Sequence, residues 1–241
     1  MADSRPTEFP GGTPPDPATP GGIASPEFIA ALLVDGDDDL AAWAIGRALE
    51  EQPRAVVFDD VIRRAMELVG SRWASGEWAI SQEHLASVAL LQALARVRSN
   101  EAAETRIGPV AVLAAPEGEQ HVTGLACLAQ VLEEDGWRVE NLGANVPAED
   151  LVQFMRGRSV DLLALSIGTP DRVPALQRTI DAMRSADADA GAVPRPIIVG
   201  GHGIEGLEAE VRDADLVTAS LADAERFARG VAVRRNETAT P

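Results

Sequence analysis

Cysteine is nearly absent from this chain, whose 241 residues include only Cys127. A single cysteine excludes an internal disulfide, and no group of cysteines and histidines has the spacing of a zinc site. No apolar run reaches the ~18 residues that a transmembrane helix needs. A basic segment followed by an apolar one, which would mark a signal peptide, is also missing from the N-terminus. These absences predict a cytoplasmic protein without a membrane partner.

Positive charge is scarce as well. The chain has 21 Lys and Arg residues against 38 Asp and Glu residues, and its formal net charge is −17. A surface of this sign repels nucleic-acid phosphates, and there is neither a helix-turn-helix pattern nor a basic stripe. We therefore expect no direct binding of nucleic acid. The hydrophobic fraction of 46% is that of an ordinary globular protein.

The residue pattern divides the chain into four parts. We expect a disordered leader at 1–25, a helical-bundle cap at 26–105, a Rossmann-like domain at 106–235 and a tail at 236–241. The leader is dense in Pro and Gly. The cap has helical periodicity throughout and predicts four helices in an antiparallel bundle. The last of these helices is expected to begin at Ser81, a good N-cap residue.

From Gly108 onward, five short apolar runs alternate with helical segments. The runs are PVAVLAA, WRVENLG, DLLALSIG, RPIIVGG and ADLVTAS. Helices are expected to begin near Val122, Pro147, Arg172 and Ile204, and LADAERFARG closes the series. Five βα units predict an α/β fold with a flavodoxin-type, five-stranded parallel sheet. Such sheets bind ligands at the C-terminal ends of their strands.

Two of the three histidines in the chain fall at predicted strand ends. His121 follows the first strand in an E-x-H-x-x-G pattern that runs from Glu119 to Gly124, and His202 follows the fourth strand. His84 lies in the first turn of the last cap helix. By residue type alone, each also has a purely structural interpretation. His121 would be a loop residue beside a solvated Glu119, His202 a polar residue of a glycine-rich turn, and His84 a residue at the bundle edge.

The E-x-H-x-x-G turn resembles the D-x-H-x-x-G signature of cobalamin-binding domains, with Glu119 in place of the commoner Asp. LSIGT (165–169), VGGHG (199–203) and NLGANVP (141–147) resemble the same family's other strand ends, in order. The resemblance implies that His121 is the lower axial ligand of cobalt and that the cofactor's own base is displaced. Imidazole suits such a metal, and Glu119 would fix the ring's tautomer. The remaining implied cofactor-binding residues of this domain are Gly124, Ser166, Gly200, Gly201 and His202.

The cap segment RWASGEWAISQEHLAS (72–87) resembles cobalamin photoreceptors, the light-responsive carotenoid-gene repressors and their relatives. This resemblance implies that Trp73 packs on the adenosyl group of adenosylcobalamin and that Glu83 and His84 face the upper axial side. By residue type alone, Trp73 is typical of a bundle core, and Glu83 is a favourable charge near a helix N-terminus. The repressors also carry an N-terminal DNA-binding module, where only a leader is expected here. They place a histidine directly after the tryptophan, where this chain has Ala74, so their bis-histidine photoproduct is not expected unless His84 supplies the ligand.

The implied function is that of a non-enzymatic light sensor. Photolysis of the cobalt–carbon bond would change the conformation or assembly of a homodimer or higher homo-oligomer and signal to a downstream protein. Photocobilins, which also hold biliverdin, are similar to this chain. Biliverdin propionates would need cations, and the cap offers Arg63, Arg64, Arg72 and Arg96. Two alternatives stay open: a corrinoid methyl carrier of a methyltransferase system, and a passive cobalamin-binding or chaperone module.

Overall fold

The computed structural model describes residues 24–98 and 108–239. The chain divides into two compact units, Met1–Arg98 and Ser99–Pro241. The leader expected at 1–25 lies almost entirely outside the described residues, as do the last residues of the cap expected to end at 105. In the part of the chain that is described, no helix combines the length and the apolarity that crossing a membrane requires.

Four helical segments build the first unit, as the periodicity predicts. They are α1 (Pro26–Val34), α2 (Asp38–Glu51), a continuous segment made of α3 (Arg54–Val57), π-helical η2 (Phe58–Arg63) and α4 (Arg64–Ala74), and α5 (Ile80–Val97). The side chain of Ser25 caps α1 by accepting the Phe28 N–H at 3.2 Å. Asp37 caps α2 in the same way through the Leu40 N–H at 3.0 Å. These caps satisfy N–H groups that a helix leaves without intrahelical partners.

The N-cap expected at Ser81 is wrong by two residues. Helix α5 begins at Ile80, with Ala79 as its N-cap. Alanine has no side-chain acceptor, and the cap is made in reverse: the Gln82 side-chain oxygen accepts the Ala79 N–H at 2.9 Å. This is one half of a capping box, and it places Ser81 inside the first turn.

Alanines line the buried side of α5 and allow neighbouring helices to approach closely. Ala86, Ala89 and Ala93 are at most 2% exposed, and they alternate with the equally buried Leu90 and Leu94. Helix α5 packs against α1, α2 and α4. A small hydrophobic core therefore holds the bundle together through close helix–helix packing.

The second unit contains the predicted parallel sheet. Its strands are β1 (Val110–Ala114), β2 (Arg138–Asn141), β3 (Leu162–Ser166), β4 (Ile197–Gly200) and β5 (Leu216–Val217). Their order is β2-β1-β3-β4-β5, and every pair is parallel. This is the flavodoxin-type order, and each predicted apolar run contributes one strand, so the predicted fold is confirmed.

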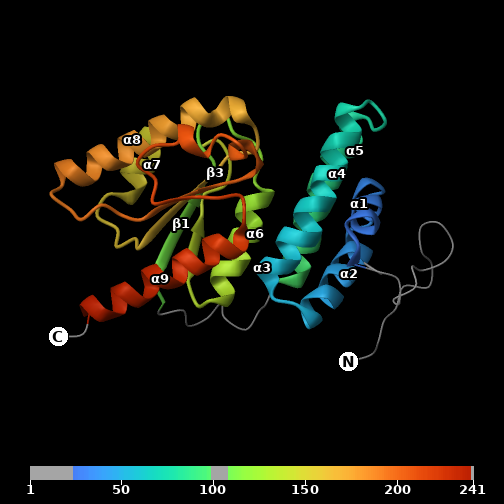
Figure 1. Cartoon of the computed structure of the whole chain (residues 1–241), viewed down its shortest axis with the longest axis horizontal. Helices are drawn as coiled ribbons and strands as arrows, with labels where there is room; N and C mark the ends of the chain where they lie inside the picture. The colour runs from blue at the N-terminus through green and yellow to red at the C-terminus, as the bar shows by residue number, and fades with distance from the viewer. Residues whose placement is uncertain (1–23, 99–107, 240–241) are drawn as a thin grey trace. The chain divides into compact units, whose positions relative to one another are not determined.

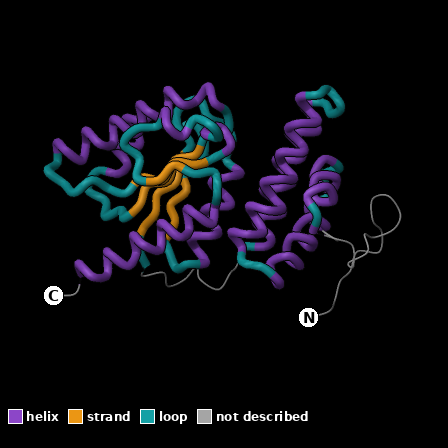
Figure 2. The backbone as a smooth tube through the Cα atoms, viewed as in Figure 1, coloured by secondary structure: helices purple, strands orange, loops and turns teal. Residues whose placement is uncertain are grey.

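Helices cover both faces of this sheet (Figure 1). One layer contains α6 (Thr123–Glu134) and α9 (Leu221–Ala239), and the other contains α7 (Ala148–Met155) and α8 (Val173–Asp189). The strands lie side by side between the two layers (Figure 2). Along β1, Ala111 and Leu113 pack with the α6 and α9 side, and Val112 and Ala114 pack with the α7 and α8 side. Because both faces are buried, β1 is a continuous apolar run rather than an alternating one.

The helix expected near Ile204 is not formed. The β4–β5 connection contains two short 3-10 turns instead, His202–Ile204 and Glu208–Glu210. Gly206 adopts φ +76° and interrupts any helix here. The apolar spacing of Ile204, Leu207 and Val211 imitates a helix because these side chains pack on the sheet core from an irregular segment. At the C-terminus, α9 continues to Ala239, into the expected tail, and residues 240–241 are outside the described part.

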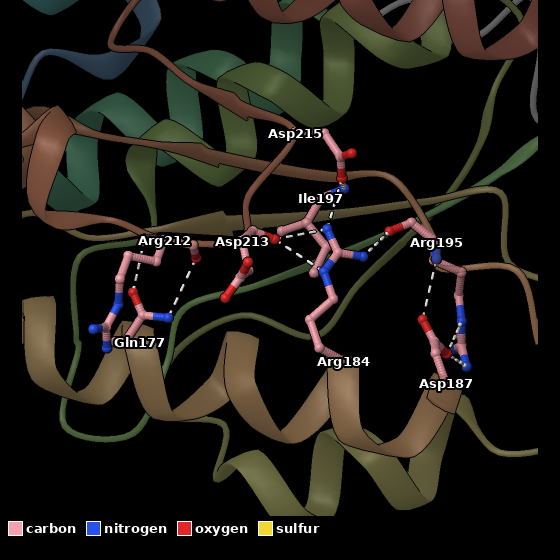
Figure 3. Close-up of polar contacts among 8 residues, drawn as sticks. All are labelled: Gln177, Arg184, Asp187, Arg195, Ile197, Arg212, Asp213 and Asp215. Carbon is pink, nitrogen blue, oxygen red and sulfur yellow. Dashed lines mark hydrogen bonds and ion pairs between the residues drawn. The ribbon is translucent and has the colours of Figure 1, made fainter. Parts of the chain in front are cut away.

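Polar side chains of α8 hold this irregular connection (Figure 3). The Arg184 guanidinium donates to the carbonyl oxygens of Asp213 (2.9 and 2.7 Å) and Arg195 (2.6 Å). It also donates to Asp215 Oδ2 at 2.7 Å, and that same oxygen accepts the Ile197 N–H at 2.8 Å. Arg184 therefore ties the start of β4 to the residues that enter β5.

Two more side chains of α8 bond neighbouring loops: Gln177 bonds the β4–β5 connection, and Asp187 bonds the segment between α8 and β4 (Figure 3). The Gln177 side chain bonds both backbone groups of Arg212, accepting its N–H at 2.9 Å and donating to its carbonyl at 3.3 Å. Asp187, which is 1% exposed, accepts hydrogen bonds from the backbone and the guanidinium of Arg195. Side-chain hydrogen bonds thus take over the backbone pairing that a helix would have provided.

Candidate functional site

The turn between β1 and α6 joins an exposed imidazole to a buried carboxylate. Glu119 is 1% exposed, whereas the His121 side chain is 56% exposed. His121 Nδ1 lies 2.6 Å from Glu119 Oε1, and that oxygen also accepts the His121 backbone N–H at 2.7 Å. Glu119 Oε2 accepts the Gly168 N–H, from the loop after β3, at 2.7 Å. The interpretation of Glu119 as a solvated neighbour is therefore wrong, because the carboxylate is anchored inside the fold.

These hydrogen bonds decide the charge of Glu119. Burial raises the pKa of the carboxyl, but the hydrogen bonds from the His121 side chain, the His121 backbone and Gly168 outweigh it and lower the pKa from 4.5 to about 2. The group is thus ionised at neutral pH and only accepts hydrogen bonds. In a neutral imidazole the proton then sits on Nδ1, which leaves Nε2 as the nitrogen with a lone pair for a metal.

Gly168 allows the His121 ring to lie where it does. A Cβ added at Gly168 would stand 2.5 Å from His121 Cγ and 2.6 Å from Nδ1. Any side chain at this position would displace the ring from Glu119. Gly168 thus supports the His121 ring in two ways. It leaves room for the ring, and its N–H donates to the Glu119 carboxylate that orients the ring.

A second group of small residues surrounds the Ser166 hydroxyl at the end of β3. A Cβ at Gly124 would lie 3.3 Å from Ser166 Oγ, and one at Gly201 would lie 2.9 Å from it. Ser166 is paired in register with Gly200 on β4. Gly201 adopts φ +99°, and a Cβ there would come within 2.2 Å of the Ile167 carbonyl oxygen. The structure therefore brings Gly124, Ser166, Gly200 and Gly201 together at the C-terminal edge of the sheet.

His202 is placed differently from these four residues. Its side chain is 64% exposed, and its Nδ1 lies 3.3 Å from Glu205 Oε2. Within the described residues, none of its hydrogen bonds or ion pairs joins it to Ser166 or His121. Its membership of the predicted cofactor set stays a prediction.

In the cap, Trp73 is not a core residue. It is 46% exposed at the end of α4. His84 on α5 has a 72% exposed side chain, and its Nδ1 lies 2.7 Å from Glu83 Oε2. The other oxygen of Glu83 accepts the Ser87 hydroxyl at 3.0 Å. Glu83 therefore holds the position of His84 much as Glu119 holds that of His121.

Sequence reasoning missed the apolar side chains around this pair. Ile80, Leu85 and Val88 of α5 are 45–52% exposed. Trp73 at the end of α4 is a fourth exposed apolar side chain, and we call these four residues the exposed cap set. The repeat of Ile80, His84 and Val88 at intervals of four residues was a signal for it, because such residues share one side of a helix.

The four cap arginines that could offer cations to propionates, or be ordinary surface residues, each have an acidic partner. The pairs are Arg63–Glu67 (2.8 Å), Arg64–Asp60 (3.9 Å), Arg72–Glu77 (3.7 Å), and Arg96 with Asp38 and Asp39 (2.9 Å to Asp39). Arg72 also stacks over the Trp78 ring at 4.8 Å. These local pairs account for the arginines without a bilin.

Family comparisons match both units. A model described as B12 binding domain matches residues 109–231, and a second model with the same description matches residues 27–98. The first covers the sheet with its E-x-H-x-x-G turn, and the second covers the helical cap.

Two curated relatives come from Myxococcus xanthus. The HTH-type transcriptional repressor CarA is 36% identical over 126 residues, which is 52% of this chain and 41% of CarA. The HTH-type transcriptional repressor CarH is 32% identical over 184 residues, which is 73% of this chain and 56% of CarH. The aligned region thus spans about half the length of these relatives.

A solved structure shares the fold. The monomethylamine corrinoid protein of Methanosarcina barkeri superposes with a TM-score of 0.67 at 19% identity and covers 87% of this chain and 98% of its own. At this identity the likeness concerns the fold alone.

Proposed function

Because this chain belongs to the B12-binding domain family, we propose that it binds adenosylcobalamin with the dimethylbenzimidazole base displaced and His121 as the lower axial ligand of cobalt. We further propose that it acts as a light sensor rather than as an enzyme. The observation that carries the proposal is the pairing of a half-exposed imidazole with a buried, ionised Glu119 at the ligand-binding edge of the sheet.

The residues present fit such a cofactor. A ligating imidazole needs an acceptor for its second nitrogen, and Glu119 provides one at 2.6 Å. The displaced nucleotide tail needs a slot without side chains. Gly124, Gly200 and Gly201 around Ser166 form a place that any larger side chain would fill.

Each side chain has a separate task in this proposal. Glu119 keeps the His121 ring oriented and, in the neutral imidazole, holds the proton on Nδ1, so that Nε2 carries the lone pair. Trp73, Glu83 and His84 would hold the adenosyl group, and the exposed cap set would supply apolar surface for it. When bound, adenosylcobalamin would supply a cobalt–carbon bond that visible light breaks. A cap that responds to light would have to interact differently with the cofactor before and after that bond is broken.

A regulatory role is supported by the two curated relatives, both of which are named as transcriptional repressors. The cap motif W-x-x-G with its Glu-His pair supports light as the signal, through its resemblance to cobalamin photoreceptors. We propose a cytoplasmic homodimer or higher homo-oligomer that signals through a further protein. Biliverdin remains a second proposed chromophore.

Reconstitution in the dark tests this function. The chain is loaded with adenosylcobalamin, its absorption spectrum and hydrodynamic size are recorded, and both are recorded again after illumination. We expect a His-on spectrum that bleaches together with a change of size or shape. The His121→Ala variant should lose the His-on spectrum, whereas Glu117→Ala, an exposed position in the same loop, controls for the substitution itself.

The alternatives give different results in the same experiment. A methyl carrier would take up methylcobalamin and keep its shape in light, and a passive binding module would bind the cofactor without any response. A His121→Ala spectrum identical to that of the unmodified chain would refute the ligand assignment. A parallel sample with biliverdin tests the second chromophore by its red absorption band.

A further inference from the structure

We propose that Asn145, in the loop between β2 and α7, is a positioning residue for the Glu119–His121 pair. The inference rests on the proposed function, because it concerns the histidine assigned to cobalt. It deepens that function by extending the support of the ligand from the β1–α6 loop and the β3 loop to a third loop.

Asn145 holds two consecutive residues of the His121 loop. Its side-chain Oδ1 accepts the Gly118 N–H at 2.7 Å. Its own backbone N–H donates to the Glu119 carbonyl at 2.9 Å. The two bonds hold the backbone just before and just after the peptide unit that joins Gly118 to Glu119, the residue whose carboxylate orients His121.

These bonds continue a backbone pairing between the β1–α6 loop and the β2–α7 loop. Pro116 and Val146 form a parallel bridge, and the Val146 N–H donates to the Ala115 carbonyl at 2.9 Å. Most of this pairing is made by backbone groups that any residue offers. The Asn145 side chain is the exception, because its bond to Gly118 requires an acceptor of this length at this position.

The backbone conformation of Asn145 explains why the residue is asparagine. It adopts φ 57°, and among the described residues other than glycine only Asp213 shares a positive φ. Asparagine tolerates this left-handed conformation better than most residues. Glycine would tolerate it too, but glycine would leave the Gly118 N–H without its acceptor.

Gly118 lies in a turn that favours glycine. It adopts φ +81°, a backbone conformation that other residues rarely take. From this turn its N–H donates to Asn145 Oδ1. Without the Asn145 acceptor, the turn should relax, and Glu119 should lose the rigid backbone from which its side chain reaches His121.

Three variants test this role. Asn145→Gly keeps the left-handed backbone and removes the acceptor. Asn145→Asp keeps an acceptor oxygen and should retain the cobalamin binding and the His121 ring shifts of the unmodified chain. Asn141→Ala is the matched control, since Asn141 Oδ1 bonds the Gly143 N–H at 3.0 Å within its own loop. For each variant, the cobalamin spectrum and dissociation constant, the ring ¹⁵N shifts of His121 in the cofactor-free protein and the melting temperature are measured.

We expect Asn145→Gly to weaken cobalamin binding on the order of 10-fold and to reduce the His-on fraction of the spectrum. The Nδ1–H signature of His121 should weaken in the cofactor-free protein as well. Asn145→Asp and Asn141→Ala should match the unmodified chain in both readouts. A merely structural role would lower the melting temperature of Asn145→Gly and leave its spectrum and ring shifts unchanged, which would overturn the proposal.

The two proposals fail in distinguishable ways. If His121 is not the cobalt ligand, His121→Ala leaves the spectrum unchanged, whereas the ring ¹⁵N shifts still report whether Asn145 orients the imidazole. If Asn145 has no positioning role, His121→Ala loses the His-on spectrum and Asn145→Gly keeps it.

Discussion

Acidification should remove a specific part of the stability of the sheet unit through Glu119. Because its pKa is about 2 in the folded chain and 4.5 without these contacts, Glu119 binds a proton more weakly when folded. It therefore stabilises the fold above pH 4.5, and this stabilisation is lost as the pH falls through the interval between the two values. The carboxylate is 1% exposed, so water screens its contacts little.

The size of the effect follows from the pKa difference. Two and a half units correspond to about 3 kcal/mol when the titration is complete. Between pH 5 and pH 3, linkage gives a loss of about 2 kcal/mol, because the unfolded chain takes up the proton in this range and the folded chain does not. Other carboxylates titrate over the same range, so the loss has to be isolated by comparison with a variant.

The comparison is between the protein with Glu119 and its Glu119→Gln variant. Urea unfolding is followed by the fluorescence of Trp137, which is 1% exposed in the sheet unit, with the cap tryptophans replaced by Phe in both proteins. The difference in unfolding free energy should shrink by about 2 kcal/mol from pH 5 to pH 3. Glu117→Gln serves as the control for removing a carboxylate from the same loop. A difference that stays constant over this range would refute the assigned hydrogen-bond network.

Three further substitutions have definite expected outcomes. Gly201→Ala should lower the unfolding free energy by roughly 2–4 kcal/mol, because its Cβ would lie 2.2 Å from the Ile167 carbonyl oxygen at φ +99°; an unchanged urea midpoint would contradict this. Arg184→Ala should cost about 1–3 kcal/mol by removing the donors to several acceptors in the β4–β5 connection, and faster hydrogen exchange in β4 would report it. Trp73→Ala should change the stability of the cofactor-free chain by less than about 1 kcal/mol because the side chain is 46% exposed. It should nevertheless shorten the retention of adenosylcobalamin, and unaltered retention would count against the assigned role of the cap.

The sheet could be predicted because its information is local. Each strand is a short apolar run buried on both faces, and such runs are visible without any knowledge of neighbours. The β4–β5 connection could not be predicted in the same way. Its apolar residues have helical spacing, but a glycine with positive φ and the hydrogen bonds of Arg184 and Gln177 decide its path. Those partners lie on α8, far away in the sequence.

Some residues of the candidate site could likewise be predicted from the sequence, and others could not. Glu119 and His121 are two residues apart, so their pairing was visible as a spacing. Ser166 and Gly201 lie at predicted strand ends, but it was the resemblance to cobalamin-binding domains that singled them out. Gly168 and Asn145 were missed because they act by backbone approach from other loops. Residue type alone does not show how closely the backbone of one loop approaches another loop. By residue type alone Trp73 is typical of a bundle core, and its exposure is evident only once the helices are packed.

The short outer strands of the sheet restrict how copies of this chain can associate. Strand β5 has two residues and β2 has four, with Arg138 and Glu140 on β2 and Asp215 directly before β5. Short edge strands with charged residues offer little backbone for a strand from another molecule to pair with. Growth of one continuous sheet across subunits is thereby discouraged at both of its edges.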